Sequence, residues 1–190
     1  AKTTILGYQW YQIEATLDES GNSVAVVGAQ PQLMEGQISS TLLIPTGLDA
    51  GAYLYRCVVS YKNNDNGRTE EIQKDQGIVV NKANMTVEAK NYTGVFDNQE
   101  HSITLTVSKP ISPSAYTIYY SSEQELTAET CEMEGTTTLP TYIHVNSNES
   151  GACAHTTYFY IKDTTGNYND YTGSATVDIQ SRMISIKTLN

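Results

Sequence analysis

The sequence predicts an all-β protein made of two β-sandwich modules in series. Apolar and polar residues alternate along many short segments, which is the pattern of strands with one buried face. Turn signals separate these segments at short intervals, and no segment shows the 3.6-residue period of a long helix. The composition agrees, because β-branched residues and tyrosine are abundant, with 14 Tyr against 2 Phe.

In the first half, we expect a β-hairpin. Residues 53–61 form one predicted strand and residues 68–80 the next. Asn66-Gly67 lies between them, and this dipeptide favours the left-handed backbone of a tight hairpin turn. The same spacing returns in the second half, where Gly166-Asn167 separates two predicted strands.

The clearest single strand covers residues 101–109, where Ile103, Leu105 and Val107 alternate with polar residues. The acid-rich stretch 123–134 fits either a helical turn or a loop. Further strands of the second half are expected at residues 85–89, 116–120, 158–162 and 171–179.

Domain organisation follows from a junction that occurs twice. Near residues 79–87 and again near 177–186, a closing strand leads through a short polar hinge into a new alternating segment. A recurrence at about 100 residues indicates an array of modules. We therefore predict one module at residues 1–81, a second at 82–180, and at 181–190 the start of a further module or a C-terminal strand.

The net charge of the chain limits the classes of partner that it can bind. The formal net charge is −10, and both halves are acidic. An acidic chain lacks the basic surface that nucleic acid and anionic lipid require, so we expect neither as a partner. No apolar run reaches the length of a membrane span, and the first residues lack the pattern of a signal peptide, so we expect no direct membrane insertion.

One motif of the first half resembles the immunoglobulin superfamily. Trp10 is followed by the corner Asp49-Ala50-Gly51-Ala52-Tyr53 and then by Cys57. The nearest likeness is to tandem immunoglobulin-like repeats in surface proteins of Gram-positive bacteria (Firmicutes). The resemblance implies that Trp10, Tyr55 and Cys57 belong to the core, together with Tyr53, and that Tyr53 or Tyr55 ties the corner to nearby backbone.

The first module departs from that pattern. Two strands precede the Trp strand in the family, but only nine residues precede Trp10 here. The module is therefore incomplete at its N-terminus, unusually built, or completed by a strand from elsewhere. Because residues 183–186 have the pattern of an extra strand, head-to-tail strand exchange between chains is one alternative.

Residues 96–105 and 168–177 look like a second repeat family, found in multi-module cell-surface proteins of Firmicutes. That resemblance implies a seven-stranded sandwich used as a stalk or adhesive repeat, extracellular and attached to the cell wall or cell surface. It implies no reaction and no cofactor. Its expected partners are neighbouring modules of the same chain and a glycan or protein of the host or bacterial surface.

The cysteines leave two alternatives. An extracellular setting permits a disulfide between Cys131 and Cys153, while Cys57 is expected as a buried thiol. A metal site would combine these two cysteines with His144 and His155, but their spacing is wider than that of structural zinc sites. We therefore expect no metal.

No catalytic constellation is expected, and the protein is predicted not to be an enzyme. The five glutamates within residues 123–134 lack the apolar surroundings that a catalytic acid needs. Neither a nucleophile elbow nor a phosphate-binding loop occurs.

Exposed aromatics are the remaining candidates for ligand contact. Tyr119, Tyr168 and Tyr171 belong to the second module, and exposed tyrosines stack on sugars or anchor protein partners. The leading function is a structural, adhesive repeat that acts as a stalk or weak recognition module. The alternative is an ancillary carbohydrate-binding module of a secreted glycan-degrading enzyme, which requires a coplanar row of solvent-facing aromatics. An enzyme fragment is the third alternative.

Overall fold

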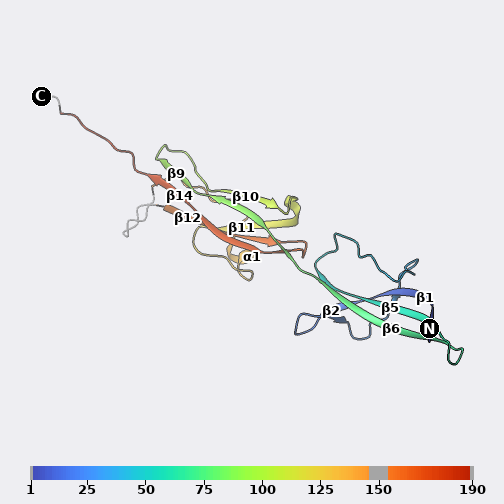
Figure 1. The fold of residues 1–190 in the computed structure, drawn as a ribbon. Coiled ribbons are helices and arrows are strands. Elements are labelled where there is room, and N and C mark those ends of the chain that lie inside the picture. The colour runs from blue at the N-terminus through green and yellow to red at the C-terminus, as the bar shows by residue number, and fades with distance from the viewer. Residues whose placement is uncertain (1, 146–153, 189–190) are drawn as a thin grey trace. The chain divides into compact units, whose positions relative to one another are not determined.

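A computed structural model describes residues 2–145 and 154–188, and β-strands make up most of it. The chain divides into two compact units, unit 1 (Ala1–Lys82) and unit 2 (Ala83–Asn190) (Figure 1). Helical structure in the described part is limited to α1 (Cys131–Glu134) and a single 3-10 turn at Pro113–Ala115. The predicted all-β class is confirmed.

Unit 1 is built on one antiparallel sheet of four strands in the order β4-β1-β5-β6. A separate hairpin, β2-β3, packs against β5. Long alternating segments form β1, β5 and β6, whereas the other strands are only two or three residues long. The strands of unit 1 are β1 (Thr3–Ile13), β2 (Ala15–Leu17), β3 (Ser23–Ala25), β4 (Gln32–Leu33), β5 (Gly51–Asn63) and β6 (Thr69–Val80).

The hairpin between β5 and β6 lies where the sequence predicts it. Asn63 N donates to Arg68 O at 2.8 Å, and Gly67 N donates to Asn63 O at 2.8 Å. Gly67 has φ +72°, a left-handed conformation that glycine adopts without steric cost.

The sheet of unit 1 has one apolar face, which we call the Trp10 face. Residues paired across an antiparallel ladder share a face. Trp10 pairs with Cys57, and Tyr8 with Val59, which in turn pairs with Ile72 of β6. The opposite face is more polar and carries the Arg56–Asp75 ion pair at 2.7 Å. The apolar and aromatic residues of the Trp10 face are Tyr8, Trp10, Tyr53, Tyr55, Cys57, Val59, Tyr61, Ile72 and Ile78, and its polar residues include Gln12, Glu70, Lys74 and Gln76.

Two facing sheets make up unit 2. The larger has the order β11-β12-β14-β9, and the smaller is the antiparallel pair β8-β10. Side chains of both sheets enclose one apolar core around Phe159, Ile161 and Val177, an arrangement consistent with a β-sandwich. The strands of unit 2 are β7 (Ala83–Asn84), β8 (Thr86–Lys90), β9 (Tyr92–Val95), β10 (Thr104–Lys109), β11 (Tyr116–Ser121), β12 (Ala154–Asp163), β13 (Tyr168–Asn169) and β14 (Tyr171–Gln180).

Parallel pairings lie at both ends of unit 2. At the entry, β7 pairs in parallel with β13, with Ala83 opposite Tyr168. At the exit, β9 pairs in parallel with β14, with Val95 opposite Gln180. The ten residues of β14 span about 30 Å, so the chain enters and leaves unit 2 at opposite ends.

Two predicted strands differ from the structure, and the stretch that fitted either a helical turn or a loop contains the turn. The strand predicted at 101–109 begins at Thr104, and His101 instead forms an isolated bridge with Tyr142. The stretch 123–134 contains a helical turn, α1, at its end. Residues 181–188 belong to no strand. Since a strand forms only against a hydrogen-bonding neighbour, the further module predicted there stays a prediction.

Candidate functional site

The four residues expected in the core of the first module lie on one face of the unit 1 sheet. Trp10 is paired directly with Cys57, and Tyr55 is 4% exposed. Trp10, Tyr53 and Cys57 are half-buried. They are less buried than a sandwich core requires, because no second sheet covers this face among residues 2–82.

Hydrogen bonds to backbone hold the edges of that face. Tyr53 Oη donates to Asp49 O at 2.7 Å, so the tyrosine ties the corner that precedes β5. Trp10 Nε1 donates to Ser39 O at 2.9 Å, which fastens the loop between β4 and β5 across the sheet. Burial raises the pKa of the Tyr55 hydroxyl and that of the Cys57 thiol, so both groups are neutral at pH 7.

Two cavities flank Trp10 on this face. The larger, about 490 Å³, lies beside Tyr8 and Ile72, and Lys74 is the single ionisable amine in its lining. The smaller, about 170 Å³, lies between Trp10, Tyr55 and the loop residues Leu42 and Ile44. Both are open and mainly apolar, so they offer dispersion contacts and few directed hydrogen bonds.

The three tyrosines proposed for ligand contact are separated. Tyr119 and its neighbour Tyr120 point to opposite faces of the larger sheet, as expected for adjacent residues of a strand. Tyr120 belongs to the main core, whereas Tyr119 packs with Leu126 in a small cluster under α1. Tyr171 is 37% exposed and stacks on Phe159 with ring centroids 6.4 Å apart. Tyr168 packs against the main core.

These three tyrosines therefore form no coplanar row. Tyr119 and Tyr171 lie on opposite faces of the sheet, because Tyr171 packs on the core side with Phe159. The coplanar row of aromatics that a carbohydrate-binding module needs is not made by this set.

Cys131 is fully buried in the cluster with Leu126 and Tyr160. Burial raises the pKa of its thiol, and Sγ lies 3.7 Å from Ala128 O. Cys153 lies outside the described residues, so the bridge between the two cysteines stays a prediction.

His144 and His155, which the sequence analysis paired for a metal site, lie beside Tyr142, and sequence reasoning missed the part of this tyrosine and of His101. The ring of Tyr142 stacks on His155 with centroids 4.4 Å apart, and its backbone bridges to His101. His155 Nε2 lies 2.7 Å from the backbone oxygen of His144, so this nitrogen carries the proton. No local pattern joins Tyr142 to His101 or His155, because these residues come from separate segments that only the fold brings together.

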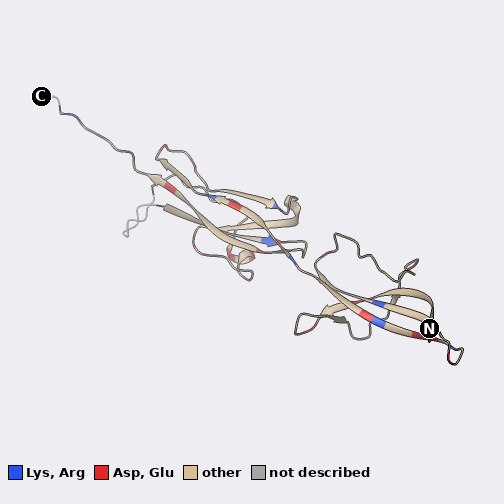
Figure 2. Ribbon diagram, viewed as in Figure 1, with Lys and Arg blue, Asp and Glu red and all other residues tan. Residues whose placement is uncertain are grey.

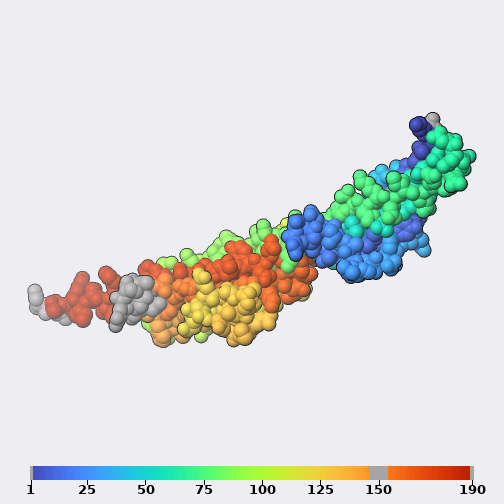
Figure 3. Space-filling view, turned by 90° about the horizontal axis from the view of Figure 1, so that it is seen from below, coloured from blue at the N-terminus to red at the C-terminus, as the bar shows by residue number. Residues whose placement is uncertain are grey.

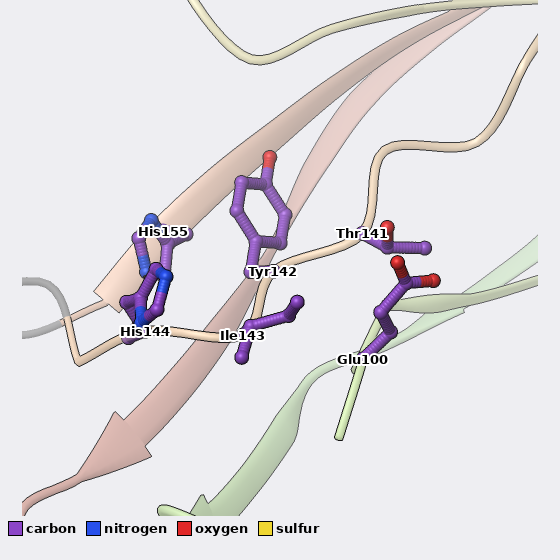
Figure 4. A pocket seen from close by; sticks show the side chains of 6 residues that line it. All are labelled: Glu100, Thr141, Tyr142, Ile143, His144 and His155. Carbon is purple, nitrogen blue, oxygen red and sulfur yellow. The ribbon is translucent and has the colours of Figure 1, made fainter. Parts of the chain in front are cut away.

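An open pocket of about 280 Å³ adjoins this group (Figure 4). Figure 4 shows His144 and His155 on one side of Tyr142, and Glu100 and Thr141 on the other. The imidazole of His155 and the hydroxyl of Tyr142 already bond to the fold, the latter to Thr157 Oγ1 at 3.0 Å. The pocket is thus lined by groups that hold the structure together.

His101 makes a related contact at the edge of the core. Its Nε2 lies 2.9 Å from Asp97 Oδ1, and its ring stacks on Tyr92 with centroids 4.1 Å apart. The hydrogen bond from His101 lowers the pKa of the Asp97 carboxyl. This arrangement fastens the 96–101 loop to β9.

The glutamates of the acidic stretch 123–134 lie at the surface of unit 2. All five glutamates of the 123–134 stretch are exposed, and Glu132 pairs with Lys162 at 2.5 Å. Among the described residues, no group of three His, Cys, Asp or Glu could hold a metal ion. Nor does any described helix have the length and apolar character to cross a membrane.

Comparison with known proteins gives no family assignment. No family model matches the sequence, and no curated protein matches it.

Proposed function

We propose that this chain is a structural, adhesive repeat segment of an extracellular bacterial surface protein, built of tandem immunoglobulin-like modules. In this role unit 2 is a spacer that carries tension between the modules joined to its two ends. The family likeness of the sequence, the acidic charge and the all-β fold support the proposal together.

The single observation that carries it is the path of the chain through unit 2. Ala83 enters beside Tyr168, and Gln180 leaves about 30 Å away at the far end of β14. A module with its connections at opposite ends extends a chain of modules, whereas one with adjacent connections would fold the chain back.

The terminal pairings suit the same role. Tension along the chain draws β9 backward and β14 forward along their own axes, because the two strands are parallel. Such a load is shared by all the hydrogen bonds of the ladder at once, including Phe96 N to Gln180 O at 2.9 Å. Strands loaded in this way separate only when all of these hydrogen bonds break together. They therefore resist more force than strands whose hydrogen bonds break one at a time.

The proposal is tested by binding of the chain to an array of glycans and extracellular-matrix proteins, with calcium and with chelator. If the chain is a spacer, it should bind the members of the array only weakly, with a Kd of about 1 mM or higher. A reproducible tight signal that Tyr171→Ala abolishes, while Tyr142→Phe preserves it, would make unit 2 a recognition domain instead.

A further inference from the structure

The Trp10 face of unit 1 is an apolar surface without a covering sheet. Ile72 is 62% exposed, and the loop that crosses the face exposes Leu43 by 85%. Among residues 2–82, only Ile13, Leu54 and Tyr55 are buried. Burial of apolar area lowers the free energy. A partner that covers the Trp10 face is therefore stabilised by the apolar area that it removes from water.

The adjacent strand β6 offers backbone as well. It is the outer strand of its sheet, and at 12 residues it is long for an edge. An edge strand of this length is a template for one more strand. Three carboxylates (Glu70, Glu71 and Asp75) and one amine (Lys74) lie along it (Figure 2).

Unit 2 carries a segment of matching chemistry. Residues 181–188 leave the end of β14 as an extended chain (Figures 1 and 3). Met183, Ile184 and Ile186 are 97%, 84% and 88% exposed. The charged residues of the segment are Arg182 and Lys187, both basic.

We propose that residues 181–188 of one copy dock as an added strand on β6 and the Trp10 face of unit 1 in a second copy. Within one copy, the segment starts about 30 Å from the junction at Ala83, at the opposite end of unit 2. Its eight residues span at most about 29 Å, so within one copy they approach the junction only when stretched back along the whole of unit 2. A second copy presents β6 without that requirement.

The side-chain pattern of the segment fits the two faces of β6. Side chains of an added strand alternate between faces, so Ile184 and Ile186 share one face and Lys187 takes the other. In a parallel register with Ile184 opposite Ile72, Arg182 lies opposite Glu70 on the Trp10 face and Lys187 lies opposite Asp75 on the other face. Both basic residues thus meet carboxylates. Ile184 and Ile186 extend the Trp10 face, and Met183 takes the other face together with Lys187.

The resulting contact is head-to-tail, so each copy offers one donor segment and one acceptor face. Such heterologous contacts do not close by a two-fold axis and build chains of copies. Self-association is not required of a spacer, and the inference stands or falls independently of the proposed function.

Sedimentation velocity of the chain over a wide concentration range tests the proposal. The wild-type protein is expected to shift from one copy toward two and more as concentration rises. The double variant Ile184→Asp/Ile186→Asp and the single variant Ile72→Asp should each weaken association about tenfold or more, because each buries a charge in the contact. Ile111→Asp, at a 90% exposed isoleucine of unit 2, is the matched control and should associate like wild type.

Mixing the two defective variants gives the sharper result. The Ile72→Asp protein keeps a good donor, and the Ile184→Asp/Ile186→Asp protein keeps a good acceptor. Their mixture should form a one-to-one dimer and nothing larger, while each alone stays monomeric. Circular dichroism checks that all variants are folded.

Several outcomes would overturn the proposal. A wild-type protein that stays monomeric at millimolar concentration excludes the contact. Association that survives the tail variant but not Ile72→Asp indicates face-to-face pairing of two unit 1 copies instead. Slow hydrogen exchange of the amides of residues 181–188 that does not depend on protein concentration indicates docking within one copy.

Discussion

A single residue of unit 2, Tyr160, contributes both a packed ring and a hydrogen-bonded hydroxyl. Its ring packs with Leu126 and Cys131 under α1, and its Oη donates to Asp170 Oδ2 at 2.6 Å. Asp170 Oδ1 also accepts from Asp163 N at 2.8 Å, so the carboxylate closes the hairpin between β12 and β14. Burial, and then the bond to Asp170, raise the pKa of Tyr160.

This contact predicts alkaline sensitivity. A tyrosine whose pKa is raised on folding stabilises the protein below its unfolded pKa, near 10, and loses that contribution as pH rises above it. Tyr160→Phe should lower the free energy of unfolding at pH 7 by about 1–2 kcal/mol. It should also flatten the fall of stability above pH 10, as measured by urea unfolding across pH.

Asp170→Asn serves as the control, because the amide keeps an acceptor at the same place. Asp170→Ala removes the acceptor, and if Tyr160→Phe/Asp170→Ala destabilises by the sum of the two single changes, the Tyr160–Asp170 bond contributes nothing.

Single residues also mark the limit of prediction from the sequence. The bond from Tyr53 to the corner backbone follows from a local motif five residues long, so the motif resemblance could anticipate a tyrosine there. The stacking of Tyr142 on His155 joins residues of separate segments. No local pattern encodes that contact, because it depends on how the sheets pack.

At the scale of elements, the parallel pair β9-β14 lies at the exit of unit 2. A side chain extends this ladder: Asn91 Oδ1 accepts from Thr176 N at 2.9 Å, one step before Val177 pairs with Tyr92. The amide thus occupies the place of a backbone carbonyl where β8 turns into β9.

Asn91→Ala removes that acceptor. The change should lower the free energy of unfolding by about 1 kcal/mol, because the Thr176 N–H loses its partner. Asn91→Asp keeps an oxygen at the same position and should retain most of the stability. Equal losses in the two variants, measured by urea unfolding, would count against a role for the acceptor.

Long strands could be predicted from the sequence, whereas short strands could not. Residues 53–61, 116–120 and 171–179 lie inside observed strands, because several alternating residues define a period. Strands of two or three residues, such as β4, β7 and β13, have too few residues to show one. They form because a neighbouring segment supplies hydrogen bonds, which a local pattern does not reveal.

At the scale of the whole molecule, the two units have very different cores. Unit 2 buries twelve apolar residues in its described part, from Met85 to Ile179, and unit 1 buries three. Since stability follows the apolar area removed from water, unit 1 is expected to be the weaker unit.

Unequal cores predict two unfolding transitions at micromolar concentration, where association is negligible. Amides of β5 should exchange with deuterium faster than those of β12, and unit 1 should unfold at the lower urea concentration. Hydrogen-exchange mass spectrometry with urea titration measures both. A single transition with equal protection of both strands would show that the units fold as one.

The central claim, that unit 2 carries tension along its length, is tested most directly by single-molecule force spectroscopy of the full chain. Unfolding of the 98 residues from Ala83 to Gln180 releases about 320 Å of chain, which is an extended length of about 350 Å less the roughly 30 Å that the folded unit already spans, and this length identifies the event. Pulling through the chain ends should require clearly more force than pulling through Lys90 and Thr104, a pair in an antiparallel ladder that opens one bond at a time. Equal forces in the two directions would contradict the claim, because the parallel terminal strands would then give unit 2 no special resistance.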